Sequence, residues 1–264
     1  MTTILTSFRN FTRASNPAQR VSYGLLLAWL LTMIALPIGR WTVGDTIIPG
    51  GVTLAAILQA AAVFSMVLTQ WGWSRTLRAA AIIAVLSWGA EFIGHRTGLP
   101  FGAYHYTEQL QPQIFGVPAL IPLAWFMLLP SSWVMAQLIV GRRTNWQKHA
   151  LFVVVSAGAL TAWDLFLDPQ MVAWNFWVWE TPSGYFGIPW SNYFGWLLVA
   201  GIITAAVNPA ELKPIPLALV YGIVWFLQTF GHAFFWGQVG PAMVGSVAMG
   251  AIMVLAFWRG RKSA

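Results

Sequence analysis

The sequence contains no cysteine, and it has few charged residues and few histidines. Without cysteine the chain can form no disulfide, and it can offer neither a thiolate ligand nor a cysteine nucleophile. Only 8% of its residues are charged, against about 25% in a typical soluble domain. Four scattered histidines do not suit the histidine clusters of membrane di-iron enzymes. Dinucleotide, ATP and acyl-enzyme mechanisms lack support as well, because there is no GxGxxG segment, Walker loop or recognisable Ser-His-Asp arrangement.

Hydrophobic residues make up 58% of the 264 residues, and they occur in long runs. A membrane-spanning helix takes roughly 20 residues, and unpaired backbone groups cannot face lipid. The alternating pattern of an outer-membrane barrel is absent. We therefore predict an all-α polytopic protein of the cell (cytoplasmic) membrane, with one transmembrane domain over 1–264. Its eight spans are expected at about 21–38, 52–69, 79–96, 119–140, 150–167, 190–207, 215–235 and 241–258.

Basic residues are distributed unevenly between the two sides of this topology. Of the 14 Lys and Arg residues, only Arg40 and Arg96 lie on one side. Because cytoplasmic loops collect Lys and Arg, we expect both termini in the cytoplasm, with the first span retained rather than cleaved. The net charge of +7 then reflects an ordinary inner face and indicates no nucleic-acid partner. The twelve basic residues expected on the cytoplasmic side are Arg9, Arg13, Arg20, Arg75, Arg78, Arg142, Arg143, Lys148, Lys213, Arg259, Arg261 and Lys262.

Two segments of the chain repeat one unusual pattern. Each apolar run ends with two polar residues four apart, Glu91 and His95 in the first copy and Asp164 and Asp168 in the second. An aromatic loop follows, and the next run opens with FGVP in the first copy and FGIP in the second. We predict two similar helical hairpins, spans three–four and five–six, that together form the site. The alternative is a coincidence between two helix starts rich in Pro and Gly.

Polar residues inside the predicted spans gather at one depth. Residues four apart on a helix share a face, so each pair forms a polar facet. Carboxyl groups are costly within a membrane and mark functional sites there. Topology places these groups in the outer third of their spans, which predicts a single pocket in the outer half of the bilayer. The groups are Glu91 with His95, Asp164 with Asp168, Gln228 with His232, and Asn192.

Several of these residues also have a purely structural interpretation. Asp168 precedes Pro169, so it could simply end a helix. His95 could pair with Glu91, and His232 could be an ordinary interhelical histidine. The four carboxyl and imidazole groups of the matched segments could instead hold one divalent ion, which we regard as the weaker interpretation.

The chemistry that fits these residues is acid–base catalysis next to aromatic rings. Protein and lipid solvate a carboxylate poorly, so a buried carboxylic acid can stay protonated near neutral pH and donate a proton. Most of the 17 tryptophans suit the interfacial belt. Trp88 and Trp163 lie beside the acids in the sequence, and ring faces attract cations. This combination suits the addition of water to an alkene, and equally a cyclase.

The segments Glu91–Trp125 and Asp164–Trp196 resemble the membrane carotenoid hydratases, which include the γ-carotene 1′-hydroxylase type and the archaeal bisanhydrobacterioruberin hydratases. The resemblance implies a carotenoid 1′,2′-hydratase that adds water across the terminal double bond of a linear ψ end group. The product would be a tertiary alcohol, formed without a redox cofactor. It implies a substrate such as lycopene or γ-carotene, and other enzymes of carotenoid biosynthesis as possible partners.

Combining both arguments, we expect Glu91 or Asp164 to protonate the alkene, and His95 or Asp168 to orient the water. No metal or cofactor is expected. A proton-coupled transporter and an isoprenoid or carotenoid cyclase are the alternatives; a transporter would favour a site near the midplane of the membrane. The residues expected to bind or position the substrate are Trp88, Tyr104, Trp163, Trp177, Asn192, Trp196 and His232.

Overall fold

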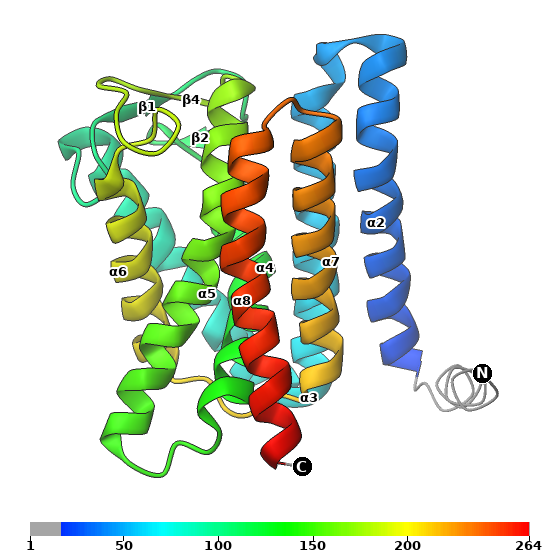
Figure 1. The fold of residues 1–264 in the computed structure, drawn as a ribbon, viewed down its shortest axis with the longest axis vertical. Helices are drawn as coiled ribbons and strands as arrows, with labels where there is room; N and C mark the ends of the chain where they lie inside the picture. The colour runs from blue at the N-terminus through cyan, green and yellow to red at the C-terminus, as the bar shows by residue number, and fades with distance from the viewer. Residues whose placement is uncertain (1–16, 264) are drawn as a thin grey trace.

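Seven helices of the computed structural model, which describes residues 17–263, are long and apolar enough to cross a membrane (Figure 1). This confirms an all-α, multi-pass membrane protein. Arg9 and Arg13, on which part of the charge argument depends, lie outside the described residues. The helices are α2 (Pro17–Val43), α3 (Ile48–Thr97), α4 (Ile121–Val140), α5 (Trp146–Ala173), α6 (Trp190–Val207), α7 (Pro214–Phe234) and α8 (Val239–Ser263), with a short 3-10 helix η1 (Asp45–Ile47) before α3.

Helix α3 contains both the second and the third predicted spans. Its 50 residues are broken at Gly72, which has φ 73° and ψ 174°, a conformation that favours glycine. A continuous helix would separate Val52 from Glu91 by about 58 Å along its axis, yet both side chains line one cavity. The two halves of α3 therefore lie side by side, and the chain reverses at Gly72. The count of eight spans stays a prediction, since the described residues give seven apolar helices with α3 counted as one.

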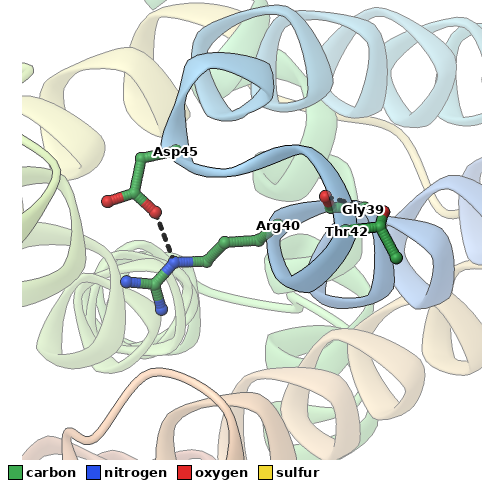
Figure 2. A network of polar contacts seen from close by, with 4 residues as sticks. All are labelled: Gly39, Arg40, Thr42 and Asp45. Atoms are coloured by element: carbon green, nitrogen blue, oxygen red, sulfur yellow. Dashed lines mark hydrogen bonds and ion pairs between the residues drawn. The ribbon is translucent and has the colours of Figure 1, made fainter.

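The ends of the described chain and the short strands lie at opposite ends of the helix bundle. The start of α2 and the end of α8 lie at one end, and the short strands lie at the other (Figure 1). This agrees with termini on the same side of the membrane, whereas the side that faces the cytoplasm stays a prediction. At the strand-bearing end, Arg40 Nε donates to Asp45 Oδ1 at 2.6 Å, which ties the last turn of α2 to η1 (Figure 2).

The loops after α3 and α5 contain four short strands, and one strand pair connects the two matched hairpins. Strand β1 (Tyr104–Tyr106) pairs antiparallel with β4 (Trp177–Trp179), so that Tyr104 lies opposite Trp179 and Tyr106 opposite Trp177. Strand β2 (Gln113–Ile114) pairs with β3 (Val117–Pro118). The β1–β4 pair joins the loop after α3 to the loop after α5, and it thereby brings the two hairpins together above the helix ends.

The FGVP and FGIP segments fold into the same tight turn. Phe115 and Gly116 have φ values of 52° and 86°, and Phe186 and Gly187 have φ values of 49° and 88°. Two central residues with positive φ are the geometry of a two-residue hairpin turn of type I′, which is rare for a phenylalanine. The flanking residues pair in both copies. The structure therefore gives the sequence repeat a common local fold.

Phe101 anchors the first long loop to the bundle. Its ring lies between Gly94 of α3 and Gly195 of α6, where an added Cβ would lie 2.7 Å and 2.6 Å from ring carbons. The side chain is 1% exposed. A larger residue than glycine at either position would displace this ring, and with it the strand that follows.

Candidate active site

A cavity of about 70 Å³ lies below the β1–β4 pair, between α3, α4, α5 and α6. We call it the acid cavity, because Glu91 and Asp168 both line it. Among the described residues none of its lining side chains is Lys, Arg or His. Two carboxyl groups therefore face a mostly aromatic and aliphatic space without a basic partner. The remaining polar and aromatic lining consists of Asn192, Phe101, Tyr104, Tyr106, Trp125, Trp177, Trp179 and Trp196.

Glu91 accepts two hydrogen bonds from the strand above it. Tyr104 Oη and Tyr106 Oη both donate to Glu91 Oε2, the second at 2.8 Å. The carboxyl group is buried on α3. Burial raises the pKa of the Tyr104 phenol above its ordinary value of 10.0, and the nearby Glu91 carboxyl raises it further. Tyr104 therefore remains a neutral hydrogen-bond donor throughout the physiological pH range.

Asp164 and Asp168 are joined by one amide group. Asn192 Nδ2 of α6 donates to Asp164 Oδ2 at 2.8 Å and to Asp168 Oδ2 at 2.5 Å. Asp168 Oδ1 accepts in addition from Trp177 Nε1 at 2.6 Å and Trp179 Nε1 at 3.4 Å. Asp164 Oδ1 is buried without a hydrogen-bond partner among the described residues. The two carboxyl groups thus differ, since Asp168 has donors on both oxygens and Asp164 on one.

Two side chains hold helix α5 around Asp168, and one of them replaces a missing backbone hydrogen bond. Pro169 has no N–H to donate to the carbonyl of Leu165, four residues earlier in α5. Tyr185 Oη donates to that carbonyl at 3.1 Å instead. His232 Nε2 lies 3.0 Å from the carbonyl of Phe166, one residue further along. Both contacts fix the helix at the point where it presents its second aspartate to the cavity.

Stacked tryptophans form one wall of the acid cavity. Trp125 and Trp196 occupy corresponding positions in the two matched segments, and their rings stack 4.4 Å apart at an angle of 10°. Behind this wall, Trp163 meets Trp196 edge to face with ring centroids 6.1 Å apart. The faces of such rings attract positive charge. This wall could stabilise a cation that forms near Glu91 and Asp168.

Six of the eleven residues predicted from the sequence line the acid cavity: Glu91, Asp168, Asn192, Tyr104, Trp177 and Trp196. Asp164 lies behind the cavity wall and contacts it through Asn192. The facet expected for Asp164 and Asp168 is therefore present, with one member in the cavity and one behind it.

The other four predicted residues lie elsewhere. His95 packs against the Phe115–Gly116 turn and makes no hydrogen bond to Glu91, and its Nε2 is buried without a partner among the described residues. Trp88 stacks on Phe92 with centroids 5.1 Å apart. His232 is buried between carbonyl groups of α5 and α7. Trp163 lines a neighbouring cavity.

Sequence reasoning missed Tyr106, Trp125 and Trp179 as lining residues. Tyr106 and Trp179 each lie two residues from a residue that was predicted, and side chains two apart in a strand point to the same face. The patterns YHY and WVW therefore carried a usable signal. What the sequence could not indicate is that these two patterns pair with each other.

Within residues 17–263 no group of three or more His, Asp or Glu side chains is arranged to hold a metal ion. The donors around Asp168 and Glu91 are phenol O–H, indole N–H and amide N–H groups. These donors satisfy carboxyl oxygens directly. The arrangement is suited to holding and moving protons in an apolar space.

Comparisons with known proteins extend this picture. The carotenoid biosynthesis protein family matches residues 51–255. A bisanhydrobacterioruberin hydratase of Haloarcula japonica is 36% identical over 121 residues, which are 46% of this chain and 40% of that relative. No solved structure matches the chain. Because the family match covers most of its length, this chain belongs to the carotenoid biosynthesis protein family.

Proposed function

We propose that the protein adds water across the terminal carbon–carbon double bond of a linear ψ end group of a carotenoid, and so forms a tertiary alcohol. The observation that carries this proposal is the acid cavity. Two carboxyl groups with different hydrogen-bond donors, Glu91 and Asp168, line it together with aromatic side chains. Alkene hydration needs an acid, a site for a cation and a base for water, and each has a candidate here.

Glu91 is the proposed general acid. Both tyrosine hydroxyls donate to Oε2, which acts as the carbonyl oxygen of a protonated carboxyl group. The other oxygen then carries the proton. It transfers this proton to the less substituted carbon of the terminal double bond, and the more substituted carbon becomes a tertiary cation.

The cation is stabilised by the cavity wall. Trp125 and Trp196 line the cavity with stacked rings. Asp168 lines the same cavity and offers a negative charge. The volume of about 70 Å³ admits only the end of a long substrate. The reaction would therefore be confined to the terminal double bond, while the rest of the polyene stays outside the cavity.

Asp168 is the proposed base for water. Its three hydrogen-bond donors, Trp177, Trp179 and Asn192, suit an ionised carboxylate, which accepts on both oxygens. Water forms a C–O bond with the tertiary carbon and gives one proton to Asp168. Asp164, with Oδ1 unpartnered, is the proposed neutral member of the pair, since two adjacent carboxylates would repel each other. His95 does not line the cavity, which favours Asp168 in this role.

The relative from Haloarcula japonica supports this reaction class, because its name is that of a hydratase. The matched part covers 40% of that relative, so the activity of the whole protein and its substrate are proposals for this chain. Lycopene, γ-carotene or a similar carotenoid with a ψ end is the proposed substrate.

The proposal is tested by producing the protein in a bacterial host that makes lycopene and analysing the extracted pigments by mass spectrometry. We expect a new pigment that is heavier than lycopene by one water. A pigment of unchanged mass and altered retention would indicate cyclisation instead. Unchanged lycopene at full protein expression would contradict the proposed reaction.

A further inference from the structure

A second cavity, of about 80 Å³, adjoins the acid cavity. Val52, Ala56, Met127 and Met171 line both cavities and so form the partition between them. Methionine side chains are unbranched and adapt their shape easily. A movement of Met127 or Met171 would therefore connect the two spaces without a change in the helices.

Two residues that line this second cavity each carry a buried N–H donor without a hydrogen-bond partner among the described residues. The donors are Trp163 Nε1 and Gln170 Nε2, whose side chains belong to residues only 1% and 3% exposed. Buried donors in folded proteins are nearly always satisfied by protein or by ordered water. Two such donors in one cavity indicate a bound group with an accepting oxygen.

The lining also restricts the chemistry of that group. None of the described residues around the cavity is Lys, Arg or His, so an anion would find no countercharge. Gln59 and Gln228 add two further amide groups, and Gln59 Nε2 donates to the carbonyl of Met127 at 3.3 Å. A neutral oxygen that both accepts and donates fits this environment. Water fits it by size too, since about 10–15 Å³ of such cavity volume is enough to hold one molecule.

We propose that this second cavity is a water chamber that supplies the water molecule added at Asp168. The inference rests on the proposed hydration reaction and assigns its second substrate a binding site. Gln170 and Trp163 hold the water beside the partition, and Gln170 lies two residues after Asp168 on α5. Water moves from the chamber to the cation through the partition.

The chamber controls the fate of the cation. A cation that meets water becomes the alcohol, whereas a cation that meets none returns a proton and becomes an alkene again. In deuterated water the second route leaves deuterium in recovered alkene. The ratio of alcohol to deuterated alkene therefore measures the water supply separately from the protonation step.

The experiment compares purified wild-type protein with Gln170→Leu and Trp163→Phe, each of which removes one unpartnered donor from the chamber. Ser156→Ala is the matched control, because it removes a buried, unpartnered polar atom from the same helix outside both cavities. We expect the ratio of alcohol to deuterated alkene to fall roughly fivefold to tenfold in the two chamber variants. The control should keep the wild-type ratio. Equal ratios in all four proteins would overturn the proposal.

A group other than water is tested in the same proteins. If the chamber holds the hydroxyl of the product, Gln170→Leu will weaken inhibition by added alcohol and leave the ratio unchanged, which also refutes the water assignment.

A second measurement does not depend on turnover. The indole N–H signals of ¹⁵N-labelled protein are recorded by NMR in detergent micelles, and the Trp163 signal is assigned by its loss in Trp163→Phe. We expect a magnetisation-transfer contact between water and the Trp163 indole proton, and its loss in Gln170→Leu. The absence of this contact in the wild-type protein would refute the chamber. If the contact is present in a protein that hydrates no carotenoid, the proposed function alone is refuted.

Discussion

Replacing Glu91 with glutamine removes the proposed acid while it keeps the shape of the site. The glutamine carbonyl oxygen can take the place of Oε2 and accept both hydrogen bonds from Tyr104 and Tyr106. The amide group takes the place of the oxygen that carries the proton. We therefore expect the free energy of unfolding to change by less than about 1 kcal/mol, since no buried donor loses its partner.

The rate of hydration should fall far more than the stability. Loss of a general acid lowers a rate by roughly 10²–10⁴-fold, which corresponds to about 2.7–5.5 kcal/mol of activation free energy. The assay is the initial rate of alcohol formation by purified protein, measured with a thermal unfolding curve of the same sample. Glu108→Gln is the matched control, because Glu108 is an exposed carboxyl group in the loop that carries both tyrosines.

The outcome that refutes this reasoning is specific. If Glu91→Gln forms alcohol at the rate of Glu108→Gln, Glu91 is not the acid. If both activity and the unfolding temperature collapse in Glu91→Gln, the carboxyl group is needed for folding, and the argument from preserved hydrogen bonds is wrong.

Three further predictions concern the surroundings of the site. Asn192→Leu leaves two buried carboxyl groups without their shared donor, and we expect a loss of about 1–3 kcal/mol in unfolding free energy, measured by thermal denaturation. The pKa of Tyr104 in the folded protein lies above 10.0, so its neutral side chain should contribute fully to the free energy of unfolding below pH 10. This contribution should decline only as the pH rises further. Tyr104→Phe should therefore flatten the alkaline fall in unfolding temperature. Tyr185→Phe should lower the free energy of unfolding by about 1 kcal/mol in the wild-type background. The loss should be smaller in the Pro169→Ala background, where a backbone N–H can again donate to the carbonyl of Leu165. Equal losses in both backgrounds would contradict the idea that Tyr185 replaces the missing backbone bond.

The fold class and the family could be predicted because their signals are local. Long apolar runs specify membrane helices by length and composition, and the segments Glu91–Trp125 and Asp164–Trp196 carry the family resemblance. The convergence of Glu91 and Asp168 also followed from topology, because each ends a span on the same side. The structure brings both into one cavity.

The detail of the site could not be predicted, since it depends on contacts between distant segments. The pairing of Tyr106 with Trp177 joins residues 71 positions apart and is decided by how two loops pack, for which no local pattern exists. His95 shares the helix face expected from its spacing, yet the FGVP turn packs against its ring. The predicted spans 52–69 and 79–96 leave a connection between them, but the positive φ of Gly72 within it could be found only in the structure.

The central claim, that the acid cavity adds water to an alkene, is tested most directly by isotope labelling. Purified protein in detergent micelles is incubated with lycopene or γ-carotene in ¹⁸O-labelled water, without O₂ or reductant, and the pigments are analysed by mass spectrometry. The account predicts a tertiary alcohol whose oxygen carries the label, and no such product from Glu91→Gln. An alcohol that forms only with O₂ and lacks the label would contradict it.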